Sequence, residues 1–322
     1  MSREATTGNT RSHGRGSAVD GILNIDKPIG ITSMDVVRRI KRASGHKHVG
    51  HGGTLDPLAT GVAPICLGQA TRMMEYLIDG TREYGATVEF GVETDTFDAL
   101  GTVTVRRDPS SLTRQDVERG LKSFEGTIDQ VPPMYSALKR DGKRLYELAR
   151  AGIEVERKPR SVKVLSIEFL EWAPPLATLN LICGRGFYVR SLAHDLGQVL
   201  GCGGHLRSLV RRRSGPFEVS KAMTLAVAEQ RIGDGTWKQS LYAPDVVVGH
   251  LRAAILDKRL EEIVRHGRPL PAGLRVPFSR PNEKCRVYGV DGRFLGIMSF
   301  NASLGQWQPD RVFALNYSES ES

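Results

Sequence analysis

The chain has 322 residues, 40% of them hydrophobic and 25% charged, and its formal net charge is +9. This length suffices for about two domains with a large buried core. No apolar run of about 18 residues occurs, so we expect no membrane span. The four cysteines form no CxxC pair, which argues against a zinc ribbon or a redox dithiol and favours a reduced, cytoplasmic compartment.

The first part of the chain predicts a tail followed by strands and helices. Residues 1–20 are polar and lack the apolar run of a secretion signal, so we expect a disordered tail. Strands are predicted at residues 21–26 and 62–67, with a helix from residue 33 and a short helix at 71–78.

Residues 83–91 alternate between apolar and polar positions, as a half-buried strand does. The side chains expected on its buried face are Tyr84, Ala86, Val88 and Phe90. Five further elements are expected up to residue 200: an acidic loop at 94–101, a helix at 113–124, strands at 162–172 and 177–183, and a helix beginning near Val189. Since strands and helices interleave with tight hairpins, residues 21–244 are predicted to form an α+β domain with a mixed, largely antiparallel sheet and flanking helices.

The chain changes character after about Pro244. A helix is predicted at residues 255–266, and Asp291-Gly292 is predicted to be the turn of a hairpin between residues 287–290 and 294–298. We therefore expect a small β-rich second domain at residues 245–317, followed by a disordered tail at 318–322.

Positive charge is concentrated in two windows. Residues 131–160 hold eight Lys or Arg against four acids, and residues 201–222 hold five against one. An anionic partner such as nucleic acid would explain both windows, and two solvated surfaces would explain them equally well.

The loop at residues 46–61 is the strongest candidate for chemistry. Its glycines allow unusual backbone conformations, and Asp56 is stiffened by the proline that follows it. A carboxylate held in this way suits a nucleophile or a base, although an Asp-Pro pair is also a common structural turn. His46, His48 and His51 make a zinc site conceivable, but their spacing matches no standard zinc motif, and the phosphate-binding pattern GxxxxGK[ST] is absent.

Six motifs stand out along the chain. The candidate loop contains GHGGTLDPLATG at residues 50–61. The others are DKPIG (26–30), REY (82–84), TDTFDALG (94–101), PPMYSALKRDGKRLYELARAG (132–152) and RGFYVRSLAHDLG (185–197). Together, and in their order along the chain, they resemble the motifs of TruB-type pseudouridine synthases, with GHGGTLDPLATG as the family's signature loop and with Arg82 in place of a lysine. The resemblance runs from about residue 21 to 225, and beyond it the chain loosely resembles the family's PUA-like domain.

The resemblance implies a role for three residues in the reaction. Asp56 matches the catalytic aspartate and Arg190 the arginine that keeps it ionised. Tyr84 matches the tyrosine that stacks on the target base and is a candidate proton acceptor. Each has a structural alternative: Tyr84 also begins a core-facing row, and Arg190 is a cation at a predicted helix start, where the helix dipole disfavours it. That conflict hints at a buried carboxylate beside Arg190.

The resemblance also implies residues that bind the substrate. Tyr188 and Leu209 match pocket-lining residues, His51 matches a histidine that holds the flipped T-loop, and Lys27 matches a structural or RNA-proximal lysine. The basic windows would contact RNA phosphates and supply affinity rather than base choice. The cations expected to do so are Lys139, Arg140, Lys143, Arg144, Arg207 and Arg211.

The implied function is isomerisation of one T-loop uridine of tRNA, at position 55, to pseudouridine. The reaction breaks the N1–C1′ bond and joins C5 to C1′, so it requires neither metal nor cofactor. The resemblance further implies tRNA as the partner, a monomer and no obligate protein partner. Three alternatives stay open: an RNA-binding module or tRNA chaperone without catalysis, a guide-RNA-dependent synthase, and a metal hydrolase built on the loop histidines.

Overall fold

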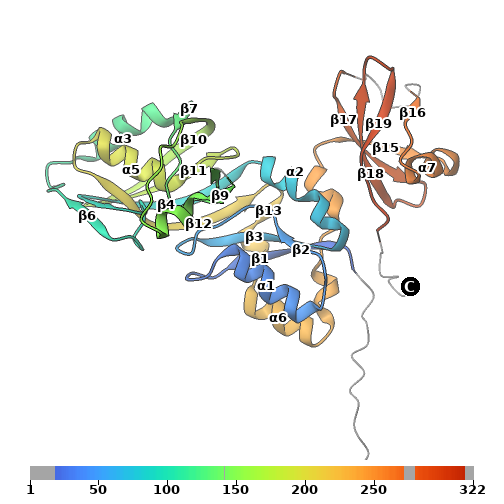
Figure 1. Cartoon of the computed structure of the whole chain (residues 1–322), viewed down its shortest axis with the longest axis horizontal. Coiled ribbons are helices and arrows are strands. Elements are labelled where there is room, and N and C mark those ends of the chain that lie inside the picture. The colour runs from blue at the N-terminus through green and yellow to red at the C-terminus, as the bar shows by residue number, and fades with distance from the viewer. Residues whose placement is uncertain (1–18, 141, 272–279, 316–322) are drawn as a thin grey trace, which may run out of the picture.

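The computed structural model describes residues 19–140, 142–271 and 280–315. A large sheet with flanking helices forms one body, and a smaller sheet with α7 (Lys258–Arg265) forms a second (Figure 1). This arrangement confirms the predicted α+β class with a small β-rich C-terminal region. None of the helices within the described ranges has the length and apolar character needed to cross a membrane.

The large sheet has ten strands and is largely antiparallel, as predicted. Only the pairs β14–β1 and β3–β12 run parallel. Its main path, in spatial order, is β14 (Met223–Thr224), β1 (Gly21–Lys27), β3 (Thr60–Leu67), β12 (Gly204–Ser214), β4 (Arg82–Phe90), β11 (Leu176–Cys183), β10 (Arg160–Ala173) and β7 (Gly126–Gln130). Two short strands lie beside this path: β2 (Val49–His51) pairs with β3, and β13 (Phe217–Glu218) pairs with β12.

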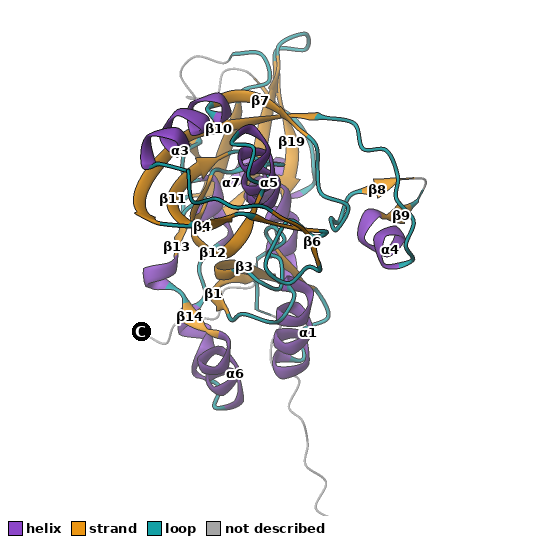
Figure 2. Ribbon diagram, turned by 90° about the vertical axis from the view of Figure 1, so that its left-hand side faces the viewer, coloured by secondary structure: helices purple, strands orange, loops and turns teal. Residues whose placement is uncertain are grey.

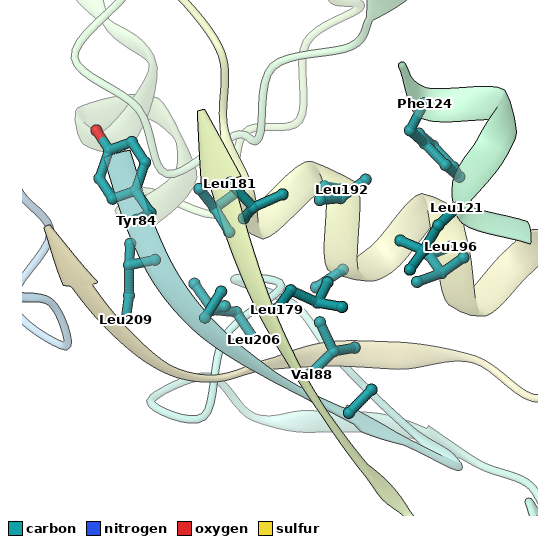
Figure 3. Close-up of a cluster of buried hydrophobic side chains, with 14 of the residues drawn as sticks. Tyr84, Val88, Leu121, Phe124, Leu179, Leu181, Leu192, Leu196, Leu206 and Leu209 are labelled. Atoms are coloured by element: carbon teal, nitrogen blue, oxygen red, sulfur yellow. The ribbon is translucent and has the colours of Figure 1, made fainter. Parts of the chain in front are cut away.

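Strand β4 places its alternate side chains in the main core. Tyr84, Ala86, Val88 and Phe90 are all buried, which confirms the predicted face. Figure 3 shows Tyr84 at one end of this cluster, with its hydroxyl pointing away from the leucines. Strand β4 therefore places the hydroxyl of Tyr84 at the edge of the core.

Two helices cover this face of the sheet, α3 (Arg114–Leu121) and α5 (Val189–Val199). Thr113 and Asp116 form the expected capping box of α3, which satisfies backbone donors of its first turn. The predicted helix at 113–124 is divided, because its last turn is the 3-10 helix η2 (Lys122–Phe124).

The N-terminal edge of the sheet is covered by α1 (Ser33–Ser44) and α6 (Leu225–Gly233), which lie side by side in Figures 1 and 2. Thr32 caps α1, and Gly45 ends it with a φ of +67°, a conformation that favours glycine. The shorter elements of the large body are η1 (Gly68–Met73), α2 (Met74–Asp79), β5 (Val92–Thr94), β6 (Val103–Arg106), η3 (Val219–Lys221), η4 (Thr236–Ser240) and η5 (Pro244–Val248).

The basic segment at 131–160 leaves the sheet between β7 and β10, as expected. It contains the hairpin of β8 (Lys139–Arg140) and β9 (Lys143–Arg144), followed by α4 (Leu145–Arg150). Figure 2 shows these elements standing apart from the large sheet. We call β8 and β9 the basic hairpin.

The second body is a five-stranded sheet packed against α7. The turn Asp291-Gly292 joins two of its strands as predicted, with Gly292 at a φ of +78°. Its strands, in spatial order, are β15 (Arg252–Leu256), β17 (Lys284–Gly289), β18 (Phe294–Asn301), β19 (Gln306–Val312) and β16 (Leu270–Pro271).

The two bodies share a continuous contact along α2. Met73 from the large body and Phe313 from the small one belong to the same buried apolar cluster. Beside it, Lys284 Nζ lies 3.0 Å from Asp310 Oδ2 and 3.1 Å from the Tyr76 hydroxyl, which also donates to Asp310. Apolar packing and a polar network therefore hold the second sheet against the first body.

One predicted element is wrong, and one central strand of the large sheet was not predicted. The helix expected at 255–266 is two elements, because the first residues pair with β17 as strand β15 and the helix begins only after Asp257, which caps it. The basic window at 201–222 contains β12, a central strand that we did not predict. Its arginines masked the strand pattern, although Leu206 and Leu209 are buried on the core side.

The predicted N-terminal tail is also too long. Val19 is buried, and the Asp20 carboxylate accepts a hydrogen bond of 2.6 Å from the Gln69 backbone. The other residues of that tail, 1–18, and the C-terminal tail at 318–322 lie outside the described residues.

Candidate active site

The loop that carries Asp56 joins β2 to β3 and is fixed from both sides. The Ser33 hydroxyl accepts a hydrogen bond of 2.7 Å from the Leu55 backbone, and the Gly30 backbone donates one of 2.8 Å to the Pro57 carbonyl. Because these partners come from the turn after β1 and the start of α1, the folded sheet holds the loop in place.

Asp56 and Arg190 form a two-oxygen ion pair. Arg190 Nη2 lies 2.9 Å from Asp56 Oδ1, and Nε lies 2.9 Å from Oδ2. The arginine side chain is 4% exposed, whereas the aspartate side chain keeps 32% of its surface open. A carboxylate does pair with the helix-start arginine as expected, but it is half-buried rather than buried, so a substrate can reach it.

Arg190 is held by more than Asp56. It donates hydrogen bonds to the carbonyls of Tyr135 (2.8 Å) and Thr96 (3.2 Å), and its Nη1 lies 3.7 Å from the carboxylate of Asp98. Asp98 is buried, so one guanidinium bridges two carboxylates. Sequence reasoning noted the acidic loop at 94–101 but did not single out Asp98, because only the fold shows which acid faces Arg190.

The protonation of Asp56 depends on two opposing effects. Burial and the charge of Asp98 raise the pKa of its carboxyl above the ordinary value, and the charge of Arg190 acts in the opposite direction. Since both carboxylate oxygens face the guanidinium and the side chain remains partly open to water, we take Asp56 to be ionised near neutral pH.

Tyr84 reaches the same region from β4. Its ring is buried, and burial raises the pKa of its phenol while nearby Arg211 lowers it. Leu209 on β12 packs in the same buried cluster as Tyr84. The arrangement brings a phenol and an apolar wall together.

Tyr188 is the residue immediately before α5, two positions from Arg190. Its backbone is clamped by Gln130, whose side chain accepts from the Tyr188 amide (2.8 Å) and donates to its carbonyl (3.0 Å). The charges of Asp56 and Arg190 both act on the Tyr188 phenol, whose pKa is raised by burial. Gln130 was not predicted, and no sequence pattern marked it.

The side chains of His51 and Lys27 are both hydrogen-bonded to backbone groups. His51 Nδ1 accepts a hydrogen bond of 3.3 Å from the Gly53 amide, and burial lowers the pKa of its ring. Lys27 is fully buried and donates to the carbonyls of Pro28 (2.9 Å) and Ile31 (2.7 Å). Burial lowers the pKa of Lys27 to about 8, with the charge of Asp56 opposing the shift. Of its two expected roles, the structural one fits these contacts.

The cations expected to contact RNA fall into two groups. Those of the basic hairpin are exposed, and the strand register sets Lys139 opposite Arg144 and Arg140 opposite Lys143. Arg207 is exposed on β12, 3.7 Å from Glu89.

The burial of Arg211 contradicts the prediction that this residue contacts RNA phosphates. It is fully buried beneath the Asp56 loop, so it does not belong to a phosphate-binding surface of the folded protein. The cause is strand alternation, which turns Arg211 inward while its neighbour Arg212 is exposed.

The three loop histidines do not assemble a metal site. Across the described ranges, no group of three or more His, Cys, Asp or Glu side chains is close enough to hold an ion. His46 instead lies 3.1 Å from both the amide and the carbonyl of Val19.

Comparison with protein families gives two matches that meet at Arg190. Residues 41–189 match the model of the TruB family pseudouridylate synthase N-terminal domain. Residues 190–258 match that of the tRNA pseudouridylate synthase B C-terminal domain.

Curated relatives cover nearly the whole chain. A protein of Dehalococcoides mccartyi (strain ATCC BAA-2100 / JCM 16839 / KCTC 5957 / BAV1) named tRNA pseudouridine synthase B is 44% identical over 297 residues, which span 92% of this chain and 97% of that protein. Proteins of the same name from Symbiobacterium thermophilum and Pseudomonas aeruginosa are 48% and 41% identical, over 78% and 87% of this chain and 83% and 91% of their own lengths. Among solved structures, a chain of a Cbf5-Nop10-Gar1 complex superposes with a TM-score of 0.69 at 26% identity, covering 92% of this chain and 84% of that one.

Proposed function

This chain belongs to the TruB family of pseudouridylate synthases and is a tRNA pseudouridine synthase, and on that premise we propose that Asp56 is its catalytic carboxylate and that its target is uridine 55 in the T-loop. The observation that carries the proposal is the two-oxygen ion pair between Asp56 and buried Arg190. A carboxylate that is ionised, fixed and still partly open is what an attack on a sugar carbon requires.

The chemistry follows from these groups. Asp56 acts on the nucleotide as the N1–C1′ bond breaks, the uracil turns, C5 bonds to C1′, and the proton on C5 leaves. Attack on C1′, attack on C6 and proton abstraction all need the ionised form of Asp56, which the Arg190 charge favours. Tyr84 is the proposed proton acceptor at C5, since it brings the second titratable oxygen to the site.

The target base must leave the folded T-loop to reach Asp56. We assign Tyr84 to stack on the flipped uracil, which offsets the cost of unstacking by roughly 1–3 kcal/mol. Tyr188 and Leu209 form the wall of the pocket. His51 is assigned to the flipped loop.

The basic hairpin is assigned to the phosphates of the T-arm. Its cations face one another across the two strands, and like charges in that arrangement destabilise a hairpin. Phosphates placed between them would remove the repulsion. Arg207 on β12 is a further candidate for such contacts because it is exposed.

We assign residues 21–244 to the catalytic domain and residues 245–317 to a PUA-like RNA-binding domain that contacts the acceptor stem. The enzyme is proposed to act as a cytoplasmic monomer, without cofactor, metal or obligate protein partner. The contact along α2 supports a fixed angle between the two domains on one tRNA.

A guide-dependent synthase is the second candidate, favoured by the similarity to a chain of the Cbf5-Nop10-Gar1 complex. Identity of 41–48% to proteins named tRNA pseudouridine synthase B, against 26% to that chain, favours the stand-alone form. Activity on tRNA without a guide RNA distinguishes the two.

The decisive experiment measures tritium release from an unmodified tRNA transcript labelled at C5 of uridine, in the presence of a chelator. We expect release by the wild type and none by Asp56→Asn, with pseudouridine mapped to position 55. The chaperone alternative predicts that both proteins fold tRNA equally and that neither releases tritium. Tritium release by the wild type that occurs without the chelator and stops when the chelator is added would instead support a metal enzyme.

A further inference from the structure

Arg211 is a fully buried cation at the centre of the active site, and the function proposed above gives it no task. Its Nε donates to the Val62 carbonyl at 2.6 Å, and its Nη2 donates to the Gly53 carbonyl at 3.2 Å. No carboxylate of the described residues lies within ion-pair distance of it, in contrast to Arg190. Nη1 meets no acceptor at normal hydrogen-bond geometry in the same part of the chain. A buried guanidinium without a carboxylate is costly, so its position requires an explanation.

The backbone of Arg211 is fixed by two neighbouring strands. It lies opposite Tyr84 in the register of β12 and β4, and opposite Gly61 in the register of β12 and β3. Gly61 has a φ of +95°, and a Cβ there would lie 2.3 Å from the Arg211 carbonyl oxygen. Only glycine allows β3 to approach β12 this closely. Strand β12 therefore lies between β3, which follows the Asp56 loop, and β4, which carries Tyr84.

The side chains of Arg211 and Tyr84 lie on the same side of the sheet, because the two residues are directly opposite one another on β12 and β4 and both are buried. The charge of the guanidinium acts on the Tyr84 phenol and on Asp56. The other titratable groups whose charge acts on the phenol are Arg82, on β4, and Cys183, on β11. Arg82 donates to the carbonyls of Leu77 and Ile78, and of the two cations Arg211 acts more strongly on the phenol.

We propose that Arg211 is a positioning residue that fixes Tyr84 and favours its phenolate, so that Tyr84 takes the proton from C5. This inference rests on the proposed function. In the step, the phenolate oxygen of Tyr84 gains the C5 proton, the electron pair of the C5–H bond forms the C5=C6 double bond, and the C6=N1 double bond opens and leaves its electron pair on N1. N1 gains a proton from water, and the phenol then returns its proton to the resulting hydroxide, so the proton balance is zero.

The direction of the pH effect follows from charge. Burial raises the pKa of Tyr84, and Arg211 partly offsets that rise because a cation favours the phenolate. Removing the guanidinium should therefore raise the pKa of Tyr84 further. If Tyr84 is the base, the rate of proton removal increases with pH up to that pKa, and the increase should move to higher pH in the variant.

The test uses single-turnover tritium release from C5-labelled tRNA at saturating enzyme, from pH 6 to 10. Arg211→Met should slow release by about tenfold or more at pH 7.5 and move the alkaline limb upward by at least about one pH unit. Its C5 deuterium isotope effect should exceed that of the wild type. Arg211→Lys, which keeps a cation, should recover most of the limb. The matched control is Arg213→Met on the same strand, because the Arg213 side chain is 39% exposed. This variant should leave the pH dependence of tritium release unchanged.

A double-mutant cycle with Tyr84→Phe separates positioning from a general structural effect. If Arg211 acts through the phenol, its substitution has little further effect in the Tyr84→Phe background. Full additivity in the cycle, or a rate of release by Arg211→Met within about twofold of the wild type across the pH range, overturns the proposal. Where Arg211→Met does not fold, Arg211→Gln, which also removes the cation, enters the same cycle. Absence of tritium release by the wild type would refute the proposed function itself, whereas wild-type release together with full additivity or an unchanged rate refutes only the role of Arg211.

Discussion

Two sets of cations in this molecule have opposite environments. Lys27, Arg190 and Arg211, in the active centre, are buried and bonded to backbone carbonyls or carboxylates. The cations of the basic hairpin are exposed on a segment that stands apart from the sheet. On the proposed function, the same residue types would serve two purposes: buried cations would set protonation states at fixed positions, and exposed cations would supply a field that attracts RNA.

The largest expected effect is on the buried ion pair. Arg190→Met leaves the carboxylates of Asp56 and Asp98 without their shared partner, which costs about 3–5 kcal/mol in the folded protein. We expect the rate of tritium release to fall at least on the order of 100-fold. Its acid limb should move to higher pH, because losing the cation raises the pKa of Asp56.

Arg119→Met, at a side chain 74% exposed on α3, is the matched control for that measurement. Its rate should stay within about twofold of the wild type, since exposed ion pairs contribute little. Equal losses in both variants would contradict the distinction between buried and exposed arginines.

The second effect concerns stability and pH. The folded-state pKa of Lys27 is lowered to about 8 from 10.5, so between these values the unfolded chain holds a proton that the folded chain lacks. Stability therefore rises with pH in this window, by up to about 3 kcal/mol in wild type relative to Lys27→Met. Urea unfolding at pH 7.5 and 10 measures it. If the free energies of unfolding of the wild type and Lys27→Met differ by the same amount at both pH values, the pKa of Lys27 is not depressed. Lys41→Met, at an exposed site on α1, provides the baseline.

The third effect tests the exposed set. Replacing all four cations of the basic hairpin by Gln should weaken tRNA binding on the order of tenfold to a hundredfold at low salt and reduce the salt slope by up to about 3. Tritium release at saturating enzyme should change little. The matched control replaces four exposed cations near α1, Arg38, Lys41, Arg42 and Lys47. An unchanged salt dependence of tRNA binding in the hairpin variant, or the same change in the control, would contradict the assignment of the basic hairpin to RNA phosphates.

The smallest effect is expected at a surface pair. Arg114 and Glu118 form an i,i+4 ion pair on α3, with side chains 56% and 41% exposed. Glu118→Gln should lower the free energy of unfolding by less than about 0.5 kcal/mol. A loss above 1 kcal/mol by chemical denaturation would mean that exposed charges matter more here than the comparison allows.

Local pattern predicted many elements, because neighbouring residues determine them. The alternation of residues 83–91 gave β4 and its buried face, Thr113 and Asp116 gave the start of α3, and Asp291-Gly292 gave a hairpin turn. The motif that contains Asp56 marked the candidate loop. A cation at a helix start predicted a carboxylate next to Arg190, and the ion pair is present.

Tertiary structure decided what local pattern could not. Strand β12 was missed because its arginines read as a solvated surface, although pairing with β3 and β4 turns Arg211 inward. Likewise, β15 is a strand only because β17 lies beside it. The sequence by itself determined most of the elements, the loop that carries Asp56 and the excess of positive charge. Which cations are buried, and which carboxylates they meet, depends on contacts between residues far apart in the chain, which no local pattern encodes.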